Sequence, residues 1–308
     1  MNRATAICFE PLDGESTSSL LLRAASSLSP VPGLVVEGLL GDAEVVASAV
    51  HRQDSVDAIV SNLGVERDAL QRTMIHRDGE NLRVGPFVVR TQDIDQTHRR
   101  VCPAALRNDA LQGRSPYQRL NWAIRVLRFD ADTGGSIIDR CGCGRDLLWR
   151  ETARIDECPA CGCLLWEAAP SDSECQDGEA VHFLSKLFSN REHRREEARS
   201  ALPSEILEWT EADLLELFET LGLFSHPEVL MRIPRADVEL WSRAAGIHAT
   251  LNGMGAIRNL IECAFEHPPA GADRFWPARR MAFANLAIHR CRSSRARDLL
   301  GELLRSFV

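Results

Sequence analysis

Five of the chain's ten cysteines lie in one short segment, CGCGRDLLWRETARIDECPACGC, at residues 141–163. Cys141 and Cys143 form one pair, Cys158 and Cys161 form a second, and 14 residues separate the pairs. A Cys-Pro-x-Cys-Gly turn presents two thiolates to one ion, and two such pairs across a short hairpin supply four soft ligands for a tetrahedral Zn²⁺. The spacing therefore predicts one structural zinc ion bound by these four cysteines.

Cys163 leaves an alternative open, because it lies two residues after Cys161 and could replace it as a ligand. The geometry of the turn favours Cys161. Four protein ligands leave no position for water, so we expect the metal to support folding rather than catalysis. The isolated thiols are expected to be ordinary core or surface residues: Cys8, Cys175, Cys263 and Cys291.

Two amphipathic segments are expected before the cysteines. Residues 16–28, STSSLLLRAASSL, place apolar side chains on one helical face, with Ser16 or Thr17 as the N-cap. In residues 54–75 two short amphipathic segments meet at Gly64, which allows a tight turn between helices. This is the pattern of a helix-turn-helix, and a helical hairpin without a recognition role has the same pattern. Beside the cysteines, residues 147–149 are expected to form a strand.

The composition is that of a folded protein with an acidic total charge. The chain has 308 residues, 44% of them hydrophobic, and a formal net charge of −8. An acidic total argues against a protein whose main task is coating nucleic acid, because phosphate binding needs clustered Lys and Arg. Lys186 is the only lysine, and no glycine-rich loop precedes it, which excludes a P-loop for nucleotide hydrolysis.

The sequence shows neither a secretory signal nor a membrane span. The first residues lack an apolar core of signal-peptide length, and no stretch approaches about 18 uninterrupted apolar residues. We therefore expect a cytoplasmic, bacterial protein. In that reducing compartment, clustered cysteines are expected to bind metal rather than form disulfides.

Residues 99–128 are locally basic. They contain seven arginines against one aspartate, with Tyr117 and Trp122 between them. Basic side chains with interleaved aromatics can bind phosphates and stack bases, whereas solvated arginines around a buried tryptophan need no ligand. We favour a core position for Trp122. The candidate contacts with nucleic acid or a protein partner, here and in the helical hairpin, are Arg67, Arg72, Arg99, Arg100, Arg114, Arg119 and Arg125.

From about residue 180 the pattern is helical. In TEADLLELFETLG, residues 210–222, Thr210 and Asp213 resemble a capping box and Gly222 is expected to end the helix. The last segment, SSRARDLLGELLRSFV, gathers leucines on one side, which predicts a packing surface. The predicted fold is mainly α with a small zinc ribbon, in three parts: an N-terminal helical domain with a helix-turn-helix (1–95), a central zinc-ribbon module (96–168) and a C-terminal helical domain (169–308).

The order of these parts resembles the TniQ family of transposition target-selection proteins. The resemblance rests on ESTSSLLLRAA, LGVERDALQRTMI, RRVCPAALRNDA and PYQRLNWAIRVLR, followed by the cysteine pairs and a helical tail, and it is best over about residues 8–165. It implies that a first zinc site of the family is lost here. Cys102 and Pro103 remain, but Ala105 replaces the second thiol, and residues 129–135 contain neither Cys nor His. The family's second zinc site maps onto the four cysteines named above.

The resemblance implies a non-enzymatic adaptor that links a target-recognition element to an AAA+ ATPase regulator and the transposase. That element is either DNA or a CRISPR effector ribonucleoprotein, and a homodimer is compatible with the sequence. No hydrolase or metalloprotease motif occurs. The alternative is a sequence-specific DNA-binding regulator with a structural zinc, whose affinity for DNA would fall steeply as salt rises. An enzyme built from carboxylates that folding brings together is a third and less favoured interpretation.

Overall fold

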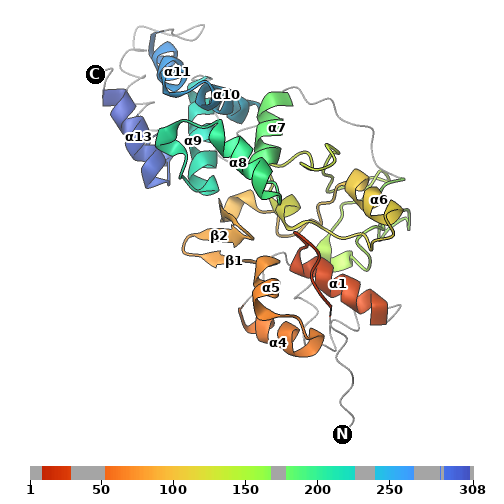
Figure 1. Ribbon diagram of the computed structural model, residues 1–308. Coiled ribbons are helices and arrows are strands. Elements are labelled where there is room, and N and C mark those ends of the chain that lie inside the picture. The colour runs from red at the N-terminus through yellow and green to blue at the C-terminus, as the bar shows by residue number, and fades with distance from the viewer. Residues whose placement is uncertain are drawn as a thin grey trace. The chain divides into compact units, whose positions relative to one another are not determined.

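The computed structural model describes residues 9–28, 53–167, 178–225, 240–266, 285 and 288–305 (Figure 1). The chain divides into two compact units. Unit 1 comprises Met1–Cys175 and Leu184–Arg195, and unit 2 comprises Gln176–Phe183 and Glu196–Val308. Among the described residues helices dominate and one three-stranded sheet is present, which confirms the mainly α class. The predicted boundaries after residues 95 and 168 stay a prediction.

The N-terminal helices of unit 1 lie where the sequence predicts them. The Ser16 hydroxyl caps α1 (Thr17–Leu28) by accepting a hydrogen bond from a backbone N–H of the first turn. Helices α4 (Gln53–Leu63) and α5 (Arg67–Arg72) are joined at Gly64, whose φ of 65° suits glycine. This confirms the two helices and the turn between them, while recognition of nucleic acid stays a prediction. The pair buries Val56, Ile59, Leu63, Val65 and Leu70.

A small antiparallel sheet follows α5, and the sequence pattern does not indicate it. Strand β1 (Ile75–Asp78) pairs with β2 (Asn81–Val84), which pairs with β3 (Phe87–Arg90). Two-residue turns join the strands, and each contains a glycine with positive φ, Gly79 at 62° and Gly85 at 57°. The buried face of the sheet carries Ile75, Leu82, Val84, Phe87 and Val89.

The rest of unit 1 consists of short segments joined by isolated bridges. The bridges connect residues that are far apart in sequence, such as His98 with Leu148. The strand expected at residues 147–149 is wrong, because only Leu148 forms a bridge and Trp149 begins a 3₁₀ turn with its indole in the core. The regular pieces are η1 (Thr91–Asp93), α6 (Pro103–Leu111), η2 (Leu120–Ala123) and η3 (Trp149–Glu151).

Two helices straddle the division between the units. Helix α7 (Gly178–Leu187) begins in unit 2 and ends in unit 1, whereas α8 (Glu192–Ser200) begins in unit 1 and ends in unit 2. A short 3₁₀ turn, η4 (Ser204–Ile206), follows α8. The predicted helical character of the chain after residue 180 is therefore confirmed within the described residues.

Helix α9 (Glu211–Phe224) is the buried centre of unit 2. Thr210 and Asp213 form the predicted capping box, with the Thr210 hydroxyl accepting from the Asp213 N–H. The expected end at Gly222 is wrong by two residues, since the helix continues to Phe224. Gly222 is itself buried, and tertiary packing outweighs the low helix propensity of glycine.

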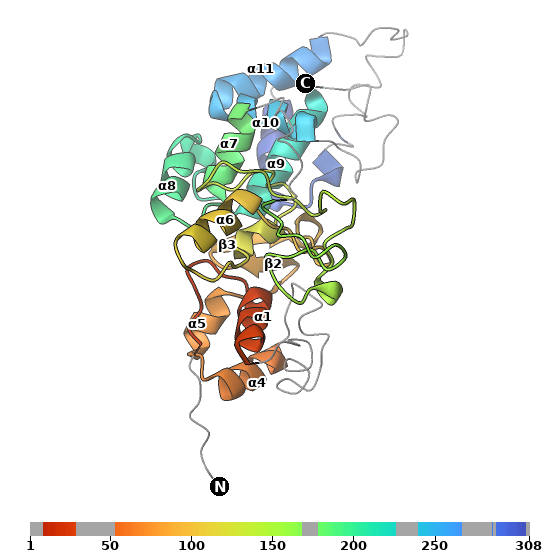
Figure 2. The same cartoon turned by 90° about the vertical axis from the view of Figure 1, so that its right-hand side faces the viewer.

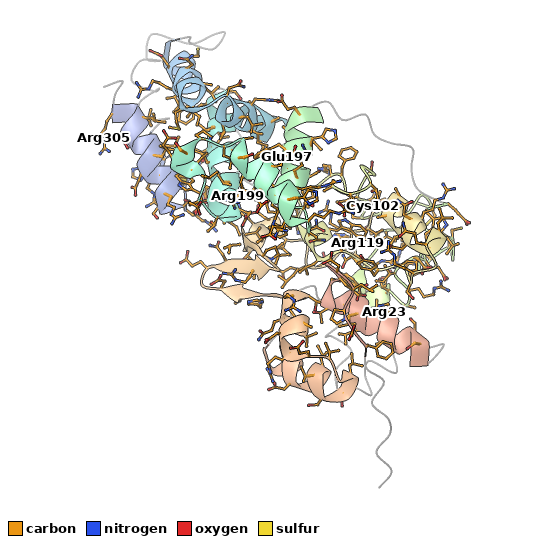
Figure 3. All side chains as sticks on the ribbon, in the orientation of Figure 1. Arg23, Cys102, Arg119, Glu197, Arg199 and Arg305 are labelled. Atoms are coloured by element: carbon orange, nitrogen blue, oxygen red, sulfur yellow. The ribbon has the colours of Figure 1, made fainter. Side chains whose placement is uncertain are left out.

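Three helices pack against α9 in unit 2: α10 (Leu240–Leu251), α11 (Met254–Glu266) and α13 (Ser294–Arg305) (Figure 2). Helix α13 leaves Arg305 exposed at its C-terminal end, where a cation interacts favourably with the helix dipole (Figure 3). Its predicted packing face is confirmed by the burial of Ala296, Leu300, Leu303 and Leu304.

Candidate metal centre

The two cysteine pairs lie in two similar turns of unit 1. In the first turn the Gly144 N–H donates to the Cys141 carbonyl at 2.8 Å, and in the second the Gly162 N–H donates to the Cys158 carbonyl at 2.9 Å. Both glycines have positive φ, 87° and 70°, a conformation that side chains other than glycine rarely adopt. The same local chemistry therefore presents both pairs of thiols.

The four thiols form one cluster. The Sγ atoms of Cys141 and Cys161 are 3.8 Å apart, and those of Cys143 and Cys158 are also 3.8 Å apart. All four sulfurs lie within 4.8 Å of one another. Sulfurs arranged tetrahedrally around Zn²⁺ at a Zn–S distance of about 2.3 Å are about 3.8 Å apart. The cluster has the donor set and the spacing that a tetrahedral metal ion requires.

Cys163 lies outside this cluster. Its exposed Sγ is 3.9 Å from the Cys161 carbonyl oxygen, and its own carbonyl accepts the Cys158 N–H at 3.0 Å. The backbone of Cys163 therefore closes the second turn, whereas its thiol does not join the other four. Of the two alternatives left open by the sequence, the structure selects Cys161.

The buried thiols of the cluster differ in acidity. Burial acts to raise the pKa of the Cys158 thiol, but hydrogen bonds from the backbone N–H groups of Cys161 and Ala160 outweigh it and lower this pKa to about 7. Burial raises the pKa of the Cys141 thiol to about 12, and contacts with the other three thiols act in the same direction. A metal ligand must be a thiolate. The backbone N–H groups of the second turn therefore favour the thiolate form of Cys158.

Two cysteines of unit 2 lie outside the thiol cluster. Cys263 is exposed, and Cys291 is buried with its Sγ 3.7 Å from the Ser293 carbonyl oxygen. The structure therefore places neither of them in the thiol cluster. Cys8 and Cys175 lie outside the described residues.

Cys102, labelled in Figure 3, marks the place where the sequence predicts a lost zinc site, and it belongs to a hydrogen-bonded network. The Cys102 Sγ lies 3.4 Å from the Thr133 Oγ1, which donates to the Asp130 carboxylate at 2.9 Å. The same carboxylate accepts from the Trp122 indole N–H at 2.9 Å. Gly135 lies against the thiol, since a Cβ there would be 2.9 Å from the Cys102 Sγ. Polar contacts, and not apolar packing alone, therefore hold this region together.

Asp130→Ala is expected to lower the free energy of unfolding by about 2–3 kcal/mol, because buried donors of Trp122 and Thr133 lose their acceptor. The metal content should not change, since Asp130 is not part of the thiol cluster. Urea denaturation and metal analysis measure the two quantities. Asp132→Ala is the matched control: its ion pair with Arg191 is partly exposed, and its loss should cost less than about 1 kcal/mol. Equal losses in both variants would contradict the assigned role of Asp130.

Two of the predicted contact arginines are buried. Arg99 is 0% and Arg100 is 4% exposed. Arg100 donates to the carbonyls of Trp122, Ile124 and Leu127, and thereby holds the segment around the second 3₁₀ turn. Buried guanidinium groups that are bound to backbone carbonyls are not available to a partner. This corrects the expectation that Arg99 and Arg100 contact nucleic acid or protein.

Arg119 is also engaged within the fold (Figure 3). Its guanidinium donates to both carboxylate oxygens of Asp109, at 2.5 and 2.9 Å, and lies 4.0 Å from the centre of the Tyr117 ring. The Asp109 side chain is completely buried, so this ion pair supports the fold. Trp122, 5.0 Å from the same guanidinium, is completely buried, which confirms its predicted core position.

Four of the predicted contact arginines are exposed: Arg67, Arg72, Arg114 and Arg125. Arg67 forms an ion pair with the exposed Asp57. Two further exposed arginines of the basic segment, Arg107 and Arg128, were not singled out in the sequence. Contact of the exposed arginines with nucleic acid or a partner stays a prediction.

Comparison with known proteins identifies the N-terminal part of this two-unit helical protein. Residues 6–129 match the TniQ family model. The chain therefore contains a TniQ domain, which confirms the predicted resemblance and makes this a transposition-associated protein. The match ends before Cys141, so the thiol cluster lies outside the matched residues. No curated protein matches the chain. Every helix within the described residues is too short or too polar to cross a membrane.

Proposed function

We propose that this protein is a non-enzymatic adaptor in DNA transposition. It links a target-recognition element, either DNA or a CRISPR effector ribonucleoprotein, to an AAA+ ATPase regulator and the transposase. The TniQ domain at residues 6–129 is the observation that carries this proposal. It supports a role in transposition, and the adaptor is the role that the resemblance to the TniQ family implies.

The thiol cluster supports a scaffolding role. Four thiolates at tetrahedral spacing suit Zn²⁺, and we assign one structural zinc ion to them. Because the protein supplies all four ligands, such an ion has no open position for water or substrate. When bound, it would join the two cysteine turns and stabilise the segment between them. The ligands are Cys141, Cys143, Cys158 and Cys161.

A sequence-specific DNA-binding regulator is the alternative. The pair of helices joined at Gly64 and the exposed Arg67 and Arg72 favour it. However, α5 has only 6 residues, and Arg67 is paired with Asp57. The net charge of −8 also opposes tight binding to free DNA. The adaptor agrees better with these observations.

Arg125→Glu is expected to weaken association with the AAA+ ATPase by about threefold to tenfold, because a reversed charge at an interface opposes a complementary partner. Arg125 is suitable because it is exposed, whereas reversal at Arg119 would place a carboxylate against the buried Asp109 carboxylate. Biolayer interferometry with an immobilised AAA+ ATPase regulator of transposition measures the affinity. Arg305→Glu, an exposed change in unit 2, is the matched control and should leave the affinity unchanged.

The same preparation distinguishes the two functions. The adaptor should bind the ATPase and bind free DNA only weakly. Tight binding to DNA in isolation, with an affinity that falls steeply between low and physiological salt, would instead establish the regulator. The absence of any association between the wild-type chain and the ATPase would contradict the adaptor.

A further inference from the structure

Among the described residues, one buried arginine without an ion pair donates to the backbone that leads into the second cysteine turn. Arg99 is 0% exposed, and its guanidinium donates to the carbonyls of Arg154 and Glu157, the latter at 2.9 Å. Its Nε has no hydrogen-bond partner among the residues that the structure describes. The two accepting carbonyls belong to the segment that leads directly into Cys158. Arg99 is therefore anchored at the entrance to the second cysteine turn.

The backbone of Arg99 also contacts the chain that follows the first cysteine pair. Its backbone N–H donates to the Leu147 carbonyl at 2.6 Å, next to the bridge between His98 and Leu148. Residue 147 follows the first cysteine pair, and residue 157 precedes the second. One side chain and its backbone thus contact both arms of the segment that carries the four thiols.

A buried guanidinium needs compensation for the hydration that it has lost. Moving a charge out of water costs several kcal/mol unless an opposite charge or hydrogen bonds compensate it. Within the described part of the chain no carboxylate forms an ion pair with Arg99. Burial lowers the pKa of Arg99 to about 10, and the group that opposes this shift most is the Cys158 thiol, ahead of the Asp156 carboxylate. The Cys141 thiol acts in the same direction.

A divalent ion with four thiolates supplies the missing anion, because its net charge is about −2. We propose that Arg99 is the counter-cation of the metal centre, and that retention of the metal depends on a positive charge at this residue. The guanidinium offsets part of the excess negative charge and holds the Arg154–Glu157 backbone in place. This role rests on metal occupancy of the thiol cluster and is independent of the adaptor function.

Arg100 provides a matched control in the adjacent position. It is similarly buried, its pKa is likewise lowered by burial to about 10, and it also donates to backbone carbonyls. The acidic groups that support its charge are Asp139 and Asp95, and no thiol is among them. Loss of either arginine removes one buried guanidinium from unit 1. Only the loss of Arg99 removes a cation beside the thiols.

The experiment compares the Zn²⁺ affinity of four full-length proteins: wild type, Arg99→Met, Arg99→Lys and Arg100→Met. Competition with a chromophoric chelator gives the affinity, and the sulfur-to-cobalt charge-transfer band after Co²⁺ substitution reports the four-thiolate site. Arg99→Met should weaken Zn²⁺ binding by about 10–100-fold, as loss of an outer partner of a metal site does. Arg99→Lys should remain within a few-fold of wild type, because it keeps the charge. Arg100→Met should bind Zn²⁺ like the wild type.

Four results would overturn the proposal. Wild-type affinity in Arg99→Met would show that no cation is needed. A loss in Arg99→Lys as large as that in Arg99→Met would assign the effect to the hydrogen bonds of the guanidinium rather than to its charge. An equal loss in Arg100→Met would assign it to general destabilisation of unit 1. A wild-type chain without metal would overturn the metal centre itself and leave the adaptor function untouched. If Arg99→Met does not fold, Arg99→Lys still decides between charge and hydrogen bonding.

Discussion

Cys158→Ser is expected to release the metal and to destabilise the segment between residues 141 and 163. Cys158 is 0% exposed, and its Sγ lies 3.8 Å from that of Cys143 in the other turn. Serine keeps the size of the side chain but offers Zn²⁺ a far weaker ligand than a thiolate. Loss of an outer partner of a metal site lowers the affinity by about 10–100-fold. Because Cys158→Ser removes a direct ligand, the affinity for Zn²⁺ should fall further than that.

Metal analysis of the purified variant and its unfolding in urea measure the two effects. Cys163→Ser is the matched control, since this thiol is exposed, lies two residues beyond Cys161 and is outside the cluster. It should keep one metal ion per chain and the stability of the wild type. Full retention of zinc in Cys158→Ser, or its loss in Cys163→Ser, would contradict the ligand set.

The cysteine turns were predictable from the sequence because their chemistry is local. The Cys-Pro-Ala-Cys-Gly turn closes through a hydrogen bond between residues four positions apart, from Gly162 to Cys158. The capping box of Thr210 and Asp213 was predictable for the same reason, since it too forms within one turn of chain. Where a few neighbouring residues determine the geometry, the sequence pattern is sufficient.

The sheet could not be predicted because its strands are too short to show a period. Each of the three strands has 4 residues, as in NLRV, where only Leu82 and Val84 point to the buried side. Two buried positions do not distinguish a strand from part of a helix. The glycines of the two turns were the available signal, but each is also compatible with an ordinary loop.

The burial of Arg99 and Arg100 depends on residues that are distant in the sequence. The carbonyls that accept from the Arg99 side chain lie 55 and 58 residues further along the chain. Those that accept from the Arg100 side chain lie 22 to 27 residues further along. A count of arginines in a segment cannot separate such side chains from exposed ones like Arg125. The sequence therefore indicated a basic surface, although two of the arginines of this segment are buried inside unit 1.

Gly246→Ala is expected to destabilise unit 2 by about 3 kcal/mol or more, the upper part of the range for overpacked sites. A Cβ at Gly246 in α10 would lie 2.1 Å from the Phe218 carbonyl oxygen and 2.8 Å from its carbonyl carbon. These are backbone atoms of α9, so no side chain can rotate to make room. The α10 and α9 backbones must therefore separate. Both helices then lose packing contacts with each other.

The same substitution at Gly301 should have the opposite sign. Gly301 lies within α13, and a Cβ there would meet no atom within 4 Å. Alanine is favoured over glycine in a helix by about 1 kcal/mol, so Gly301→Ala should stabilise unit 2. Urea denaturation followed by the helical circular dichroism signal measures both variants, because helices dominate unit 2. Stabilisation by Gly246→Ala would show that α10 does not approach α9 this closely. Helix propensity favours alanine over glycine at both positions. If Gly246→Ala destabilises unit 2 while Gly301→Ala stabilises it, the difference is therefore due to the backbone contact between α10 and α9.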